Sequence, residues 1–313
     1  MTGFVVRRLL AAIPTLFAVL TLVFVIVRVV PGDPAYALLG DRATPEAVAA
    51  LHARLGLDRP LVVQYAVFVG RVLRGDFGRS MATGEPILHA IAAAVPPTLE
   101  LTAAAMLVGV VLGVPVGVWA ALHRNRAVDI GARLLSLLGL SFPVFVSGIF
   151  LLLAFAVRWP LFPVLGDLQP GDPLGNLRKL VLPAATLGLV MAAYVIRVTR
   201  SAMLHVLNED YMRTARAKGV PRGRVVWRHG LRNAALPVVT VVGLYVGILL
   251  GNSALTEIVF SRPGLGSVIV AALNARDYTM LQALLVIYCL LIVLVNLLTD
   301  LIYGLVDPRV QQG

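Results

Sequence analysis

The stretch 208–237, NEDYMRTARAKGVPRGRVVWRHGLRNAALP, is among the most polar and basic segments of an otherwise apolar chain. It lies between two long apolar runs, 180–193 and 236–255. A short basic loop between two membrane spans is expected on the cytoplasmic side, because Lys and Arg are retained there. The sequence therefore predicts a polar element that hangs beneath the bilayer, within reach of a partner protein.

Local signals divide this stretch into two short helices. Asn208 or Asp210 is expected to cap the first helix, because either side chain can accept a hydrogen bond from a free backbone N–H. Gly219 is expected to end that helix, and Pro221 to begin the second at its first turn. The prediction is a helix–turn–helix.

Composition places the chain in the membrane. Apolar residues make up 59% of the 313 residues and charged residues only 14%, whereas a soluble protein has about 25% charged residues. The formal net charge of +11 does not indicate nucleic acid, because the Lys and Arg concentrate in loops on one side. The only cysteine, Cys289, lies in an apolar run, so no disulfide framework is expected.

The sequence shows no catalytic or metal-binding pattern. No GxxxxGK[ST] phosphate loop, HExxH motif or nucleophile–base set is present. The histidines are scattered and have no metal-ligand spacing. We expect a non-enzymatic protein without cofactor or metal, whose energy comes from separate subunits.

Hydropathy predicts an all-α polytopic fold with six transmembrane helices and both termini in the cytoplasm. Three domains are expected: 1–30, the N-terminus and first span; 31–97, an extracytoplasmic helical insert; and 98–313, a five-span core with a long cytoplasmic loop at 201–235. The predicted spans are 9–30, 98–122, 134–157, 180–198, 236–255 and 281–305.

The insert is expected to hold short helices that cannot cross the bilayer. Thr44 caps the first and Pro45 occupies its first position. Amphipathic stretches follow at 61–73 and 87–95, the latter ending at Pro96 and Pro97. We expect them to form an extracytoplasmic cap or to lie in the membrane interface.

Small residues suggest where helices pack closely. Gly109, Gly113 and Gly117 recur every fourth residue in the second span, a spacing that permits close approach. In the fifth span, Gly243, Gly247 and Gly251 form a similar ladder, which could face an equivalent subunit.

Four polar residues of the spans have expected structural roles. Arg28 is expected to anchor the first span in the outer headgroups. Glu100 is expected near a helix N-terminus, where a carboxylate is favourable. Ser141 is expected to bond its own backbone, and Asp300 to make structural hydrogen bonds. The segment 256–278 is too short to cross and return, so it predicts a partly buried outer hairpin.

The polar stretch resembles the cytoplasmic coupling loop (the EAA loop) of ABC importer permeases, in its dipeptide/oligopeptide/nickel branch. The matching residues read DYMRTARAKG and RHGLRNAALP. Arg213, Thr214 and Ala215 stand where the general form has Glu-Ala-Ala, and Arg232 stands where it has Pro. The segments PGDP at 31–34 and 257–278 resemble the same branch.

This resemblance implies a type I ABC importer permease fold in the bacterial inner membrane. It implies one half of a translocation path for a dipeptide, oligopeptide, glutathione or nickel chelate. The implied partners are a second homologous permease subunit, two ATPase subunits, an extracytoplasmic substrate-binding protein and membrane lipid. The insert would help to dock the binding protein.

The resemblance also implies the coupling residues. Those expected to contact the ATPase are Tyr211, Arg213, Thr214, Ala215, Arg216, Ala217, Lys218 and Gly219. Those expected to support the loop are Arg228, His229, Arg232, Asn233 and Pro237.

Two other classes of protein remain as alternatives. A self-sufficient channel or ion-coupled carrier needs polar groups near the bilayer centre, where these spans are almost wholly apolar or small. A membrane-embedded enzyme needs a catalytic set that the sequence does not show. A preparation without any nucleotide-binding partner would favour either alternative.

Overall fold

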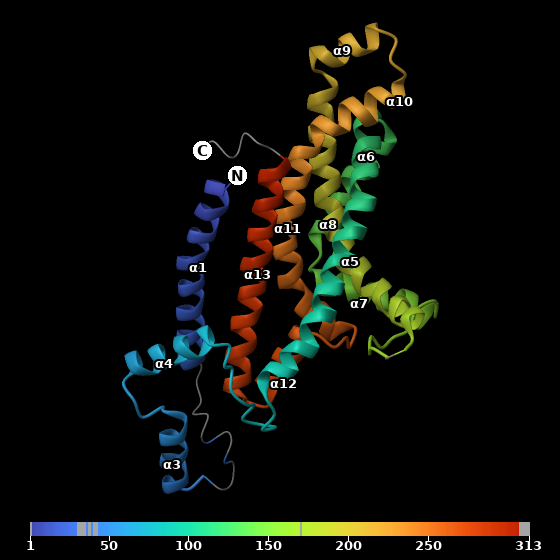
Figure 1. The fold of residues 1–313 in the computed structure, drawn as a ribbon. Coiled ribbons are helices and arrows are strands. Elements are labelled where there is room, and N and C mark those ends of the chain that lie inside the picture. Colours follow the sequence, from blue (N-terminus) through green and yellow to red (C-terminus); the bar gives the residue numbers. More distant parts are fainter. Residues whose placement is uncertain (1, 30–35, 37–38, 40–42, 170, 307–313) are drawn as a thin grey trace. The chain divides into compact units, whose positions relative to one another are not determined.

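The computed structural model describes residues 2–29, 36, 39, 43–169 and 171–306 (Figure 1). In these ranges the regular elements are helices, and the β pairing is one isolated bridge between Arg79 and Pro86. Five helices are long and apolar enough to cross a membrane, and a bent pair makes a sixth crossing if counted as one span. The all-helical multispan prediction is confirmed. The PGDP segment lies outside the described residues.

Contacts divide the chain into two compact units. Unit 1 is built around Pro97–Pro263 and includes the chain from Val295 onward, whereas unit 2 consists mainly of Val6–Pro96 and Gly264–Leu294. Three long helices contribute residues to both units: α1 (Thr2–Val29), α5 (Ile87–Leu122) and α13 (Tyr278–Val306).

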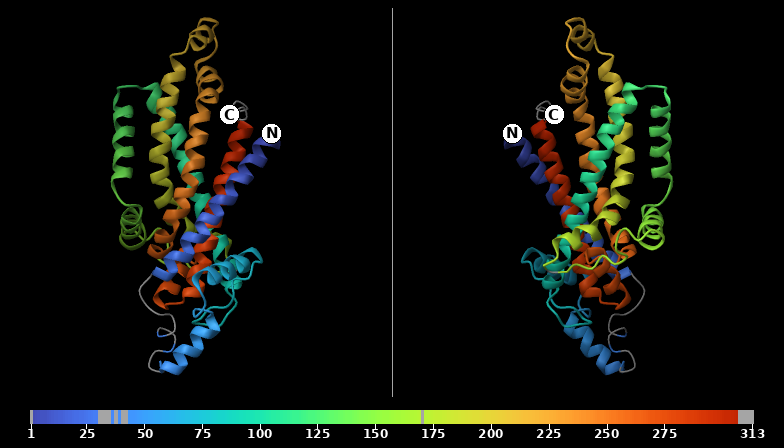
Figure 2. Two further views of the ribbon diagram at one scale, coloured as in Figure 1. Left: turned by 90° about the vertical axis from the view of Figure 1, so that its left-hand side faces the viewer. Right: turned by 90° about the vertical axis from the view of Figure 1, so that its right-hand side faces the viewer.

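Unit 1 is organised around α8 (Pro173–Leu207), which is longer at both ends than the predicted span. Asp172 caps its start by accepting from the Gly175 N–H at 2.9 Å. Its most apolar window is 72% buried, and Figure 2 shows α5 and α11 running beside it. The elements of unit 1 after α5 are α6 (Ala127–Ser141), α7 (Val144–Leu152), the π-helical segment η2 (Leu153–Arg158), α8, α9 (Asp210–Ala217), α10 (Arg222–Arg224), the π-helical segment η3 (Val225–Leu231) and α11 (Arg232–Val259).

The glycines of α5 pack against α8, as their spacing predicted. A Cβ built at Gly113 would lie 2.6 Å from the Val195 Cβ, and one at Gly117 would lie 2.7 Å from the Thr199 Cβ. Neither distance is compatible with ordinary carbon contact. The backbones of α5 and α8 therefore approach more closely than any larger residue would allow.

The predicted span at 134–157 is broken into two helices, and it is one crossing only if the bent pair is counted as a single span. The chain bends by 102° between α6 and α7–η2. Phe142 is extended, with φ −98° and ψ 141°, immediately before Pro143, because the proline ring disfavours helical backbone in the preceding residue. Ser141 donates to the Leu137 carbonyl at 2.7 Å, which confirms the prediction for that side chain.

Charged residues are buried where α5 meets the end of α11 and the turn that follows it. Glu257 accepts from the Thr98 hydroxyl at 2.7 Å. Arg262, which is fully buried, pairs with Glu100 at 2.5 Å. The expectation that Glu100 lies at a helix N-terminus is wrong, because α5 begins at Ile87. Its carboxylate balances a buried guanidinium instead.

The glycine ladder of α11 meets the last turns of α13 within this chain. A Cβ added to Gly243 would collide with Thr299, and one added to Gly247 would lie 3.2 Å from the Asn296 Oδ1. Gly251 has no atom within 4 Å of the same position. The first two glycines therefore serve packing inside the subunit. The Asp300 side chain lies outside the described residues.

Unit 2 contains α1 from Val6 onward, α3 (Pro45–Leu55), α4 (Leu61–Leu73), the start of α5, α12 (Leu265–Asn274) and the first half of α13. The Thr44 side chain accepts from the Ala47 N–H at 3.3 Å, and Pro45 opens α3. Both features are as predicted. Helix α4 has the predicted bounds of 61–73.

The prediction of a third short helix in the insert, ending before Pro96, is wrong. It is the first part of α5, which continues through Pro96 and Pro97 without a break. Ile87 and Ile91 from this part pack with Leu265 and Leu284 in a buried apolar cluster. This packing helps to hold the start of α5 in place, although the prolines remove two backbone donors from the helix.

Candidate functional site

The loop between α8 and α11 folds into the short helix α9 and a tight turn, at the end of unit 1 (Figure 1). Gly219 has φ +72°, a left-handed conformation that glycine adopts at little cost. Its N–H donates to the Arg216 carbonyl, and the Val220 N–H donates to that of Ala215. The prediction that Gly219 ends this helix is confirmed.

The predicted N-terminal cap is wrong. Glu209 occupies the capping position and makes no side-chain cap bond. The Asn208 amide donates to the Leu204 carbonyl at 2.9 Å, at the end of α8. The Asp210 carboxylate pairs with Arg213 at 3.3 Å. Neither candidate therefore caps α9: Asn208 bonds to the last turn of α8, and Asp210 pairs with a side chain of α9 itself.

The second predicted helix is not a separate element. Pro221 directly precedes α10, which continues through η3 into α11, so that residues 222–259 form one helical run. A π-helical segment accommodates an extra residue per turn and is frequent at functional sites. It places Trp227 on the surface, 54% exposed. The sequence pattern predicted neither the continuous helical run nor the π-helical segment.

One apolar side chain fixes α9 to the rest of unit 1. Met212 is fully buried and packs with Met203 of α8 and with Val225 and Val226 of η3. The burial of Met212 was not predicted, because the stretch is polar overall, although Met212 is the only large aliphatic residue of α9. The helix is thus coupled by packing to both flanking spans.

The remaining predicted coupling residues lie mainly on the outer side of α9. Ala215 is half-buried, whereas the others are exposed: Tyr211, Arg213, Thr214, Arg216, Ala217, Lys218 and Gly219. Three of them are cationic, so the exposed face of α9 and its turn is strongly positive. Such a face favours a partner surface with acidic residues.

Among the predicted support residues, Asn233 makes the specific contacts. Its amide donates to the Tyr211 hydroxyl at 3.0 Å and to the His229 carbonyl at 2.9 Å. This joins α9 directly to the first turn of α11. The structure does not bring Arg228 and Arg232 into this network, and both are exposed.

Two further support residues have different surroundings. His229 is half-buried within η3. Pro237 lies inside α11 and is exposed. Neither lies on α9.

An ion pair near this loop was missed by sequence reasoning. Asp129, fully buried at the start of α6, accepts two hydrogen bonds from the Arg200 guanidinium of α8 and one from the Asn125 N–H. Arg133 lies 3.6 Å from the same carboxylate. The sequence signal for this pair was Asp129 itself, the one acidic residue in the stretch 123–133, which also contains three arginines. Through this pair α6 is tied to α8.

Within the described ranges, no group of three or more His, Cys, Asp or Glu could hold a metal ion. The site is therefore the positively charged helix α9, which is fixed by packing between the ends of α8 and α11. Such a helix can bind the surface of another protein and pass a displacement on to these two helices.

Comparison with known families covers nearly the whole chain. Residues 113–312 match the family model described as "Binding-protein-dependent transport system inner membrane component". Residues 1–102 match the corresponding N-terminal model.

Several curated relatives are similar over 99% of both chains. The di/tripeptide transport system permease protein of Pseudomonas aeruginosa (strain UCBPP-PA14) is 42% identical. The glutathione transport system permease protein of Salmonella typhimurium is 42% identical, and the dipeptide transport system permease protein of Escherichia coli (strain K12) is 43% identical.

A solved structure, the inward-facing MetNI methionine ABC transporter, matches with a TM-score of 0.56. It is 21% identical and covers 71% of this chain and 99% of that one. At this identity the match shows the fold, which is of the type I ABC importer permease kind. The predicted fold class is confirmed.

Proposed function

The chain belongs to the family of binding-protein-dependent transport system inner membrane components and is a multi-pass permease subunit of an ABC importer, and we propose that its solute is a small peptide or glutathione. The names of the relatives, all at 42–43% identity over 99% of the chain, support this class of solute. Nickel chelates are the remaining candidate from the sequence resemblance.

The proposed assembly contains this chain, a second homologous permease, two ATPase subunits and an extracytoplasmic binding protein. The chain itself hydrolyses no ATP in this proposal. Both termini and the loop containing α9 are placed in the cytoplasm, where Lys and Arg concentrate. The ATPase subunits are then on the same side as α9.

The observation that carries the coupling role is the way α9 is held. Met212 links it by packing to α8 and η3, and Asn233 links Tyr211 to α11. A partner that displaces α9 therefore displaces the ends of two spans together. ATP-driven closure of the ATPases would rotate these spans against the second permease and open the path outward, as a rigid-body transition.

In this proposal the exposed side of α9 docks in a groove of the ATPase. The predicted contacts are Tyr211, Arg213, Thr214, Ala215, Arg216, Ala217, Lys218 and Gly219. Ala215 and Gly219 permit close approach, and Arg213, Arg216 and Lys218 supply charge complementarity. The supporting set Arg228, His229, Arg232, Asn233 and Pro237 holds the loop.

Uptake by the reconstituted importer tests this docking. Ala215→Asp places a carboxylate on the docking side of α9, and Gly219→Pro is incompatible with φ +72°. We expect either variant to lose at least 90% of ATP-driven uptake while membrane insertion and assembly of the two permeases persist.

Gly223→Asp is the matched control. It adds the same charge to the same loop, in α10, where a Cβ meets nothing within 4 Å. It should retain uptake. Normal uptake by both Ala215→Asp and Gly219→Pro would contradict docking through α9.

The solute is tested separately with labelled dipeptide, tripeptide and glutathione in competition. Saturable uptake of one of them that depends on the binding protein supports the proposal. Uptake of a nickel chelate alone would refute the peptide or glutathione assignment.

A further inference from the structure

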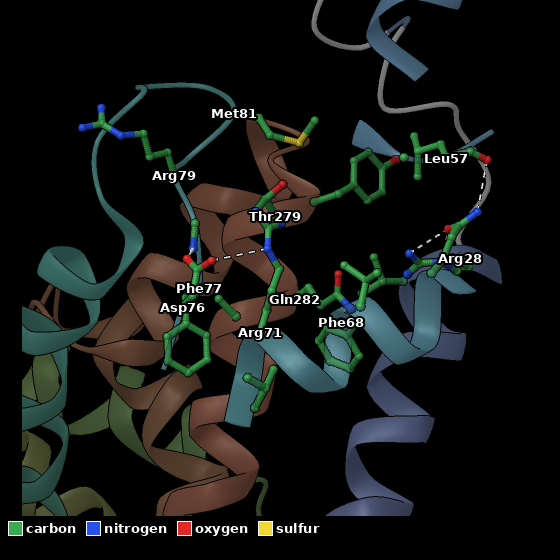
Figure 3. Close-up of a pocket in the computed structure, with 18 of the residues that line it drawn as sticks. Arg28, Leu57, Phe68, Arg71, Asp76, Phe77, Arg79, Met81, Thr279 and Gln282 are labelled. Carbon is green, nitrogen blue, oxygen red and sulfur yellow. Dashed lines mark hydrogen bonds and ion pairs between the residues drawn. The ribbon is translucent and has the colours of Figure 1, made fainter. Parts of the chain in front are cut away.

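Unit 2 contains a cavity of about 760 Å³ between the end of α1, helix α4, the turn at 76–81 and the start of α13 (Figure 3). Its lining includes the apolar side chains Phe68, Val72 and Phe77. It also includes the polar side chains Arg28, Arg71 and Gln282. Such an amphipathic cavity suits a ligand with one charged and one apolar part.

The polar side chains of the lining favour an anion. The Arg28 Nε and Nη2 atoms donate to the Gln64 Oε1 at 3.1 and 3.0 Å, which holds this guanidinium at the cavity. Arg71 lies 3.4 Å from Asp76 and remains 61% exposed. The Gln282 Nε2 is buried without a hydrogen-bond partner in the described structure, so it still needs an acceptor.

The other two arginines at the cavity, Arg59 and Arg79, are less suited to hold an anion. Arg79 donates to the Gly84 carbonyl at 2.7 Å and points away in Figure 3. Arg59 is exposed. Against these cations the cavity has one carboxylate, that of Asp76. The lining is therefore net positive.

The position of α4 fixes the level of this cavity relative to the membrane. The Tyr65 hydroxyl lies 2.6 Å from the Thr21 hydroxyl, and its ring meets Phe24 edge-on at 5.2 Å. Thr21 and Phe24 belong to the membrane-spanning segment Arg7–Arg28 of α1. Helix α4 thus lies against the last turns of a span, at the boundary between hydrocarbon and headgroups.

The outward side of α4 has the composition of a lipid-facing surface. None of its residues is buried, and Val62 and Leu73 are 79% and 72% exposed. Its polar side chains Gln64 and Arg71 are seven residues apart, so they share the edge that faces the cavity. A helix exposed to water would carry charge on its outer side, whereas an interfacial helix buries an apolar side in lipid.

We propose that this cavity binds the phosphate of an anionic phospholipid. Arg28, Arg71 and the Gln282 amide face the phosphate, and an acyl chain runs along the exposed apolar side of α4. Arg28, which the sequence predicts as an anchor in the outer headgroups, is thereby part of a defined lipid site. The site does not depend on the coupling role of α9, so each can fail alone.

The test counts lipids that remain on the purified importer complex. The complex is reconstituted in nanodiscs of phosphatidylcholine with 20% phosphatidylglycerol, extracted in mild detergent and analysed by native mass spectrometry. Arg28→Gln/Arg71→Gln removes both guanidiniums. Arg74→Gln is the matched control, since it removes a neighbouring exposed arginine that does not line the cavity.

We expect the wild type and Arg74→Gln to retain phosphatidylglycerol equally, and the double variant to bind it roughly 30-fold more weakly. Equal retention by all three proteins would overturn the proposal and favour an acidic segment of a partner protein. Loss of bound lipid on addition of 10 mM inorganic phosphate would also overturn it, because the site would then prefer a free anion.

A second measurement does not depend on how the double variant folds. A spin label at Val62→Cys, in a Cys289→Ser background, should be accessible to oxygen dissolved in the bilayer and shielded from a water-soluble nickel reagent. The reverse accessibility would place α4 in water and would contradict the proposal.

Discussion

The close contact between α5 and α8 gives the most quantitative prediction for this fold. In Gly117→Ala, the new Cβ would lie 2.7 Å from the Thr199 Cβ and 2.8 Å from the Ile196 carbonyl oxygen. Carbon atoms normally approach to about 3.5–4.0 Å. Neither neighbour can rotate away, because one is a Cβ and the other is backbone. The helices must therefore separate by about 1 Å.

Overpacking of this kind costs about 1–3 kcal/mol in the free energy of unfolding. Alanine also has about 1 kcal/mol better helix propensity than glycine. Gly131→Ala in α6 is the control, since its Cβ meets nothing within 4 Å. Because both variants gain the same propensity, the difference between them measures packing alone.

The assay is the melting temperature of the purified protein, followed by loss of its monodisperse chromatographic peak after heating. We expect Gly117→Ala to melt roughly 3–10 °C below Gly131→Ala. Gly109→Ala should lie between them, because its collision is largely with the Met191 side chain, whose Cγ and Sδ can move. Equal melting of Gly117→Ala and Gly131→Ala would refute the close contact.

Three further interactions are tested by substitution, with the same thermal assay and with limited proteolysis. Met212→Ala removes the anchor of α9 and should cost about 2–3 kcal/mol, seen as faster cleavage of the loop; unchanged cleavage would contradict that anchoring. Asp129→Asn should destabilise by about 2–4 kcal/mol, because it leaves Arg200 without its buried partner; an unchanged melting temperature would show that the pair is dispensable. Glu100→Gln removes the charge that balances the buried Arg262, and it should lower the free energy of unfolding by about 1–3 kcal/mol; the loss is limited because Glu100 is 49% exposed. Arg262→Met in the same protein should restore stability, and a further loss would contradict the pairing.

Several elements of the structure follow from local sequence signals. The bounds of α4 and the caps at Thr44 and Gly219 depend on residues next to one another in the chain, so the sequence contains the necessary information. The glycine ladder of α5 was also readable, because its spacing matches one helix face. The family resemblance supplied the fold class.

Other elements depend on packing between distant residues. Pro143 stands at a sharp bend, whereas Pro96 and Pro97 lie inside a continuous helix. A proline alone gives no indication of which outcome applies, because neighbouring helices decide whether the lost hydrogen bond is tolerated.

The candidate site shows the same division. Its exposed cations were evident in sequence, but the burial of Met212 and the contact between Tyr211 and Asn233 were not. Met212 packs against Val225 and Val226, and Asn233 lies in the first turn of α11, so both contacts depend on the path of the chain through the π-helical segment η3. No residue type specifies such a segment.

The orientation and docking of α9 are tested most directly by labelling Lys218→Cys in a Cys289→Ser background. Cys289 is the only native cysteine, so the label reports one site. A membrane-impermeant maleimide should react in inverted vesicles and not in intact cells, and added ATPase subunits should protect the site. Reaction from the outside of intact cells would contradict the proposed coupling mechanism.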